Sequence, residues 1–134
     1  MTSSRFVAST LAAILATAVA GCTAKESTPA DGGKASATQV TVNATDTGCA
    51  PSTSEGAPGS TTFVVTNNGA KVTEFYVYGK DDRVLAEVEN ISPGLHRNLV
   101  VEFNEPGTYR LACKPGMVGD GIRTDFTVKA PTQK

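Results

Sequence analysis

The residues with the most reactive side chains stand close together near the C-terminus. Cys113 closes an alternating stretch that begins after the turn signal Glu105-Pro106-Gly107, and Met117 follows in a loop rich in Pro and Gly. A thiolate and a thioether are soft ligands, which suit copper. The same two residues also have a structural interpretation, in which Cys113 is one half of a disulfide and Met117 fills an irregular gap.

Further side chains of ligand type stand at the boundaries of other predicted segments. Cys49 lies in a loop, and Glu74 begins a strand. Glu89 opens a turn motif, and His96 begins the strand after it. A thiolate favours Cu(I), whereas a carboxylate favours a harder ion such as ferric iron or Cu(II). The alternatives are a solvated strand-end carboxylate for Glu74, a carboxylate bonded to turn amides for Glu89 and a surface imidazole for His96.

The segments that would position these side chains all have the pattern of β-strands. Apolar and polar residues alternate over short runs that are separated by Gly, Pro and Asn turn signals, and no run has a helical period. The predicted strands are residues 39–45, 52–56, 61–67, 74–78, 84–90, 96–103, 107–113 and 123–129. Short strands at this spacing predict an all-β fold, namely a Greek-key β-sandwich.

The alternating direction of the strands predicts where the candidate ligands lie. If successive strands run in opposite senses, the loops at residues 46–51, 67–73, 89–96 and 113–121 fall at one end of the sandwich. Loops that share one end often carry functional side chains. The sequence therefore predicts a metal site at this end, formed from Cys49, Glu74, Glu89, His96, Cys113 and Met117.

The first part of the chain has the features of an export signal. Arg5 precedes an apolar run over residues 6–20, which is too short to span a membrane and typical of a signal peptide. The segment Val19-Ala20-Gly21-Cys22 resembles a bacterial lipobox, in which the cysteine carries lipid. We therefore expect a signal peptide at 1–21, a lipid anchor on Cys22 that holds the exported chain to the membrane, and a polar tether at 22–38. The folded domain is expected at 39–130, with a short tail at 131–134.

The cysteine count leaves a choice open. The chain has three cysteines, and lipid on Cys22 would leave Cys49 and Cys113. An oxidising compartment would let these two form a disulfide. Alternatively, both act as thiolate ligands of a metal ion.

Composition excludes several classes of function. The formal net charge is −1 and no basic stripe is present, which argues against nucleic acid as a partner. The single histidine, His96, argues against most zinc enzymes and against a Ser-His-Asp site. Because no nucleophile–base pair is visible, we expect no enzymatic activity.

Several motifs resemble those of the cupredoxins. The run from Gly107-Thr108-Tyr109 to Cys113 and Met117 is similar to a cupredoxin copper loop, but the usual histidine between the cysteine and the methionine is missing. Because a blue copper site needs two imidazoles, an electron-transfer centre is not expected. The set of motifs resembles the cupredoxin-like domain of the EfeO iron-uptake lipoproteins, without their imelysin-like domain. The motifs that carry this resemblance are residues 47–52, 61–69, 74–75, 89–94 and 106–109 leading to Cys113.

The resemblance implies an extracytoplasmic, lipid-anchored metal-binding module. Copper or ferric iron would be its ligand, and an iron-uptake permease or companion lipoprotein would be its partner. The alternative is a β-sandwich stapled by a disulfide between Cys49 and Cys113, which serves as a structural or protein-interaction module without metal.

Overall fold

The computed structural model describes residues 37–132 of the chain. The expected signal peptide, Cys22 with its expected lipid and the tether as far as residue 36 lie outside the described residues, as do the last two residues of the tail. No helix in the described part is long and apolar enough to cross a membrane.

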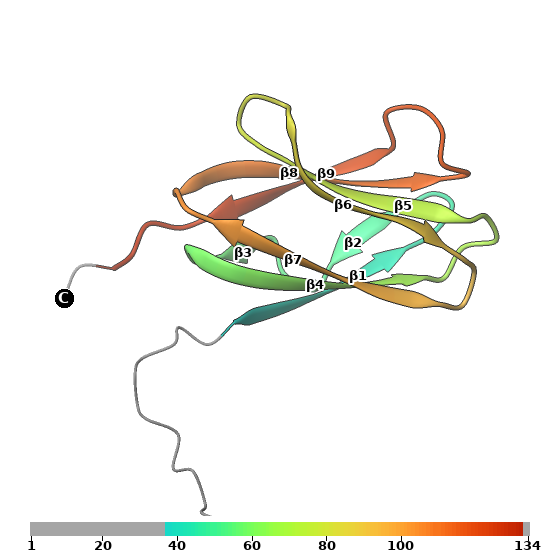
Figure 1. Ribbon diagram of the computed structural model, residues 1–134, viewed down its shortest axis with the longest axis horizontal. Coiled ribbons are helices and arrows are strands. Elements are labelled where there is room, and N and C mark those ends of the chain that lie inside the picture. Colours follow the sequence, from blue (N-terminus) through green and yellow to red (C-terminus); the bar gives the residue numbers. More distant parts are fainter. Residues whose placement is uncertain (1–36, 133–134) are drawn as a thin grey trace, which may run out of the picture. The chain divides into compact units, whose positions relative to one another are not determined.

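Between residues 37 and 132 the structure contains nine β-strands in two sheets (Figure 1). One sheet has the order β2-β1-β4-β7 and the other has the order β3-β9-β8-β5-β6. The predicted β-sandwich is therefore confirmed. The strands are β1 (Thr38–Ala44), β2 (Cys49–Pro51), β3 (Glu55–Gly56), β4 (Gly59–Asn67), β5 (Thr73–Tyr78), β6 (Val84–Ile91), β7 (His96–Phe103), β8 (Gly107–Pro115) and β9 (Ile122–Val128).

Strands that are neighbours in a sheet are often not consecutive in the chain, so the chain passes between the two sheets. β1 lies parallel to β4, while β7 pairs antiparallel with the other side of β4. In the second sheet β5 lies between β6 and β8, and both pairs are antiparallel. Parallel neighbours need a connection that leaves the pair, and here the chain between β1 and β4 contributes β2 to one sheet and β3 to the other.

The structure has a strand where the sequence predicted a loop. Residues 46–51 were expected to be a loop, but Cys49–Pro51 forms β2, which pairs with β1 through Ala44↔Cys49. A tight turn joins them, in which the Thr45 N–H donates to the Gly48 carbonyl at 2.9 Å. Pro51 argues against a strand in the sequence, because proline lacks the N–H that a strand donates. β2 is an edge strand, however, and there the missing N–H is tolerated.

The core forms between the two sheets from the apolar residues of each alternating strand. Phe63 of β4 is fully buried, and its ring centroid lies 5.5 Å from Phe75, 6.3 Å from Phe103 and 5.4 Å from Phe126. These rings come from both sheets, so Phe63 holds the two layers together at the centre of the sandwich. Tilted and edge-to-face contacts of this kind add to the burial energy of aromatic rings.

One core position carries a polar atom without a partner. The Oγ1 of Thr61 is buried and makes no hydrogen bond within residues 37–132. Because an unpaired buried hydroxyl costs free energy, Thr61→Val should raise the free energy of unfolding by about 1 kcal/mol. Thr73→Val is the matched control, since the buried Thr73 hydroxyl does donate, to the Glu74 carbonyl at 3.3 Å. Urea denaturation of both variants checks this, and a stabilised Thr73→Val with an unchanged Thr61→Val would contradict it.

Candidate functional site

The predicted clustering of loops at one end is borne out by the strand directions. The connections β1–β2, β4–β5, β6–β7 and β8–β9 share this end, which we call the loop end. The candidate ligands all stand in these connections or in the strand residues next to them. They are Cys49, Glu74, Glu89, His96, Cys113 and Met117.

A buried amide fixes the loops of this end to one another. Asn67, the last residue of β4, donates its side-chain N–H groups to the carbonyls of Lys71 at 2.8 Å and Ile91 at 2.7 Å. Its side-chain oxygen accepts from the Gly69 N–H at 2.9 Å. Asp46 of the β1–β2 loop accepts from the N–H groups of Ala70 and Lys71 of the β4–β5 loop. The sequence motif around Asn67 therefore has a structural role that its pattern did not reveal.

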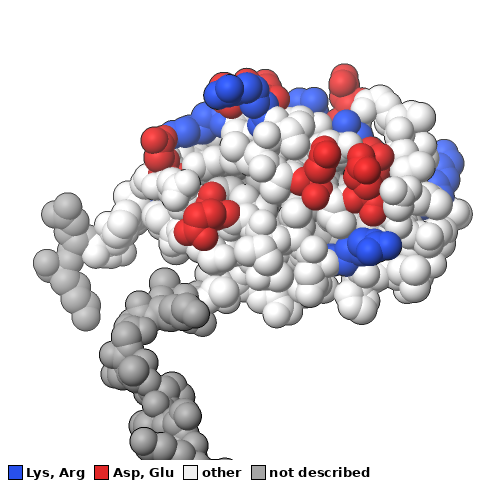
Figure 2. Space-filling model, viewed as in Figure 1, with Lys and Arg blue, Asp and Glu red and all other residues white. Residues whose placement is uncertain are grey.

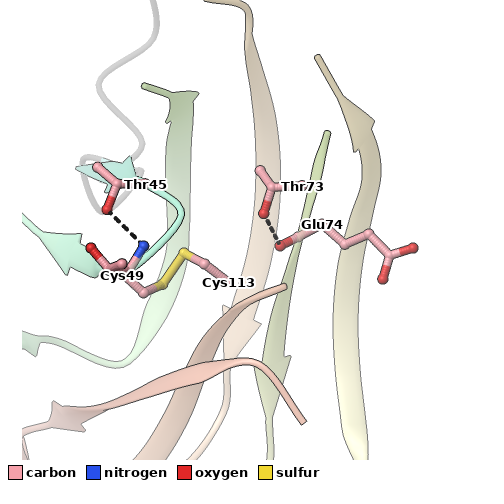
Figure 3. The surroundings of a disulfide bond; sticks show 6 residues. Thr45, Cys49, Thr73, Glu74 and Cys113 are labelled. Atoms are coloured by element: carbon pink, nitrogen blue, oxygen red, sulfur yellow. Dashed lines mark hydrogen bonds between the residues drawn. A yellow bond between two sulfur atoms is a disulfide. The ribbon is translucent and has the colours of Figure 1, made fainter. Parts of the chain in front are cut away.

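The two cysteines of the domain are bonded to each other (Figure 3). The Sγ atoms of Cys49 and Cys113 are 2.01 Å apart, and the two Cα atoms are 5.4 Å apart. The bond joins β2 of one sheet to β8 of the other, and both residues are buried. The sequence left two alternatives for these cysteines, a disulfide or two thiolate ligands of a metal ion, and the structure has the disulfide. In this state neither sulfur is a thiolate that could bind a metal ion.

Glu74 lies on the other face of the sheet from the disulfide. In the pairing of β5 with β8, Phe75 stands opposite Cys113, and both are fully buried in the core. The preceding pair, Glu74 and Lys114, therefore points outward. Figure 3 shows the Glu74 carboxylate directed away from the sulfur atoms. The structure thus separates these two predicted ligands although both stand at the loop end.

The outward-facing Glu74 belongs to a small polar cluster around Tyr76. The Tyr76 hydroxyl donates to Oε2 of Glu74 at 3.0 Å, and Nζ of Lys114 lies 3.9 Å from the centroid of the Tyr76 ring. The ring also stacks on Tyr78, with centroids 5.8 Å apart. Burial raises the pKa of Tyr76, and the hydrogen bond to Glu74 and the negative charges of Glu74, Glu87 and Glu89 raise it further.

The raised pKa of Tyr76 predicts a loss of stability in alkali. A phenol that stays neutral in the folded protein but ionises near pH 10 when unfolded stabilises the fold below about pH 10. This contribution disappears as the pH rises above that value. Tyrosinate absorbance should show Tyr76 ionising only as the protein unfolds, and Glu74→Gln should lower the midpoint of this step. If all three tyrosines ionise together near pH 10 in folded protein, this account of Tyr76 is wrong.

The remaining candidates lie in three places. Glu89 is exposed on β6, two residues after Glu87, which stands opposite Tyr76, so the alternation of the strand places it on the outer face with Glu74. His96 is exposed and lines a shallow pocket of about 340 Å³ with Val88, Arg97 and Asn98. Met117 is 41% exposed in the β8–β9 loop, where its φ is 57°. Over residues 37–132 no group of three or more His, Cys, Asp or Glu side chains is arranged to hold a metal ion.

The comparison with known families gives the class of protein. A family model described as a cupredoxin-like domain matches residues 10–128, and the chain belongs to this family. The crystal structure of dithionite-reduced auracyanin from Roseiflexus castenholzii has the same fold, with a TM-score of 0.55 and 17% identity over 69% of this chain and 98% of that one.

Relatives among the curated proteins carry the name of an iron-uptake component. The chain is 35% identical over 75 residues to "Iron uptake system component EfeO" of Escherichia coli K12 and of Shigella flexneri. The match covers 56% of this chain and 20% of each relative, so the chain spans about a fifth of their length.

The donor atoms of the described residues do not match a blue copper centre. A blue copper centre needs two imidazoles and a thiolate. This chain has a single histidine, and Cys113 is in a disulfide, so its residues do not fit such a centre. The carboxylates of Glu74 and Glu89 are oxygen donors, the ligand type that hard ions prefer, but among the described residues they are not part of a group of three or more such side chains.

Proposed function

We propose that this protein is an extracytoplasmic, lipid-anchored metal-binding module that captures or delivers a hard metal ion, ferric iron before Cu(II). Glu74 is the principal ligand, and Glu89 is the second carboxylate on the same outer face. His96 begins β7 and Met117 lies in the β8–β9 loop, and both are assigned peripheral roles. The sulfurs of Cys49 and Cys113 serve the fold in the oxidised protein.

The observation that carries this proposal is the state of the cysteines. Because the buried disulfide withholds both thiolates, the thioether of Met117 is the one sulfur donor left among the described residues of the loop end, and a Cu(I)–thiolate site has no ligands there. The carboxylates near Tyr76 are the oxygen donors that remain on a common surface. Oxygen ligands favour ferric iron over soft ions.

The similarity to EfeO supports a place beside a membrane iron-uptake system. Those relatives are named as a component of an iron-uptake system. In our proposal the lipid on Cys22 holds this domain at the outer side of the membrane, where it passes its metal to a permease or to a companion lipoprotein. The chain has no enzymatic role in this scheme.

Metal titration tests the proposal. Ferric ion supplied as its nitrilotriacetate complex should bind to the oxidised full-length chain, and Glu74→Gln should weaken binding by about tenfold or more. Glutamine keeps an acceptor for the Tyr76 hydroxyl but removes the charge. Glu55→Gln is the matched control, because Glu55 lies in β3 and is paired with Lys129 instead. If wild type and Glu74→Gln bind ferric ion equally, the assignment of Glu74 is wrong.

The second candidate is a metal-free interaction module. The buried disulfide between the sheets favours it, since such a bond stabilises a small exported domain without any metal. The same titration separates the two candidates. An oxidised chain that takes up neither ferric iron nor copper, and whose thiols do not react without reductant, would support the interaction module.

A further inference from the structure

A cleft opens at the end of the sandwich opposite the loop end. It lies between the β5–β6 turn and the β7–β8 turn and has a volume of about 500 Å³. Leu85 and Tyr109 form an apolar part of its wall. Leu85 is 49% exposed, so its side chain gives the cleft an apolar surface that a ligand can reach.

The charges of the cleft do not balance. Lys80 Nζ lies 2.6 Å from Oε2 of Glu105, and Arg83 pairs with Asp81, so both bases are already neutralised by an acid of the same cleft. These contacts hold the pKa values of Glu105 and Asp81 below their usual range. Glu102 also lines the cleft, and within residues 37–132 its carboxylate makes no ion pair. The cleft therefore presents one free negative charge beside an apolar wall.

The surface that continues from the cleft has the same character. Figure 2 shows separate acidic side chains on the face that carries β6 and β7, with a basic side chain on the same face. Glu87 and Glu89 of β6 make no ion pair with any other described residue, whereas Asp125 and Glu55 on other strands do. Two exposed apolar side chains lie on the same strands, Val84 at 48% and Val100 at 62% exposure. Unpaired carboxylates and exposed apolar residues thus occur together along these two edge strands.

From this combination we propose that the cleft between the β5–β6 and β7–β8 turns docks a basic, partly apolar segment of a partner protein. An arginine or lysine of the partner places its methylene stem on Leu85 and its charged group on Glu102. Long basic side chains bury their stems on apolar surface in this way. On β6 and β7 the unpaired carboxylates of Glu87, Glu89 and Glu102 outnumber the one unpaired base, Arg97. This excess of negative charge draws a basic segment toward the cleft and disfavours an acidic one. The contact residues Leu85 and Glu102 are not among the proposed metal ligands, and the chelator in the test below keeps Glu89 free of metal.

The test uses a short peptide as a stand-in for the partner segment. An amidated Gly-Arg-Leu-Arg-Gly peptide is titrated into the isotopically labelled full-length chain in neutral lipid nanodiscs, with a chelator present, and backbone amide shifts are recorded. Shifts should concentrate at Leu85, Glu102 and their neighbours, and they should shrink at high salt. Empty nanodiscs and a Gly-Glu-Leu-Glu-Gly peptide are the blanks.

Two variants decide the result. Glu102→Lys should weaken binding by about fivefold, because the reversal replaces an attraction with a repulsion. Leu85→Ser should weaken it without changing the salt dependence. Asp120→Lys, in the β8–β9 loop at the other end, is the control and should bind as wild type does. The proposal is overturned if the basic peptide causes no shifts, if the acidic peptide causes the same ones, or if Asp120→Lys weakens binding as much as Glu102→Lys.

Discussion

Replacing Cys49 and Cys113 together by alanine is expected to lower the free energy of unfolding by about 4 kcal/mol. The disulfide joins residues that are 64 positions apart, so the bond removes much of the conformational freedom of the unfolded chain. It also ties β2 of one sheet to β8 of the other, at sites that are 8% and 0% exposed. Guanidinium denaturation of the oxidised wild type and the double variant measures the difference.

A control separates the stability contributed by the disulfide bond from the stability lost by removing the two cysteine side chains. Wild type that is unfolded, reduced and then measured in reductant should lose a similar amount of stability, because it retains both side chains without the bond. A double variant that is destabilised by less than about 1 kcal/mol would show that the inter-sheet bond is not a main source of stability.

Phe63→Ala is expected to cost about 4 kcal/mol. The ring is fully buried and packs against Phe75, Phe103 and Phe126, so its removal leaves a cavity between the sheets that the surrounding strands fill only partly. The heat-capacity change and the m-value should stay close to those of wild type if the sandwich itself is retained.

The neighbouring residue is the matched control. Val64 stands on the opposite face of the same strand and is only partly buried, so Val64→Ala should cost less than about 1 kcal/mol. Equal losses for Phe63→Ala and Val64→Ala would contradict the placement of the core between the sheets.

The sequence predicted the architecture well because the strands carry a clear alternating pattern. In β4, Phe63 and Val65 alternate with partly exposed residues, and β7 occupies the predicted range His96–Phe103. β2 was missed because a strand of three residues that ends in Pro51 is defined by its pairing with β1, which no local pattern shows.

The candidate site was predicted only in part. The sequence correctly predicted which loops lie at the same end of the sandwich. The prediction of one metal site assumed that side chains at this end also face the same side of a sheet, and the alternation along each strand was not used to check this. Cys113 follows Tyr109 and Leu111 on the inner face, whereas Glu74 precedes the inward-facing Phe75. This period of two already places the thiol and the carboxylate on opposite sides of the sheet.

The role of Tyr76 could not be read from the sequence. A tyrosine between Phe75 and Val77 has the pattern of an outward-facing residue, but only the three-dimensional pairing of β5 with β6 and β8 surrounds it with Glu74, Glu87 and Lys114. The same is true of the cleft, which forms from turns that are separated along the chain.

X-ray absorption at the iron edge of the oxidised full-length chain, loaded with a limiting amount of ferric ion, tests the central claim most directly. The account predicts a first shell of oxygen and nitrogen neighbours without sulfur, because the thiolates are withheld in the disulfide and Glu74 supplies the main contact. A sulfur neighbour in that shell, or a chain that retains no iron, would contradict it.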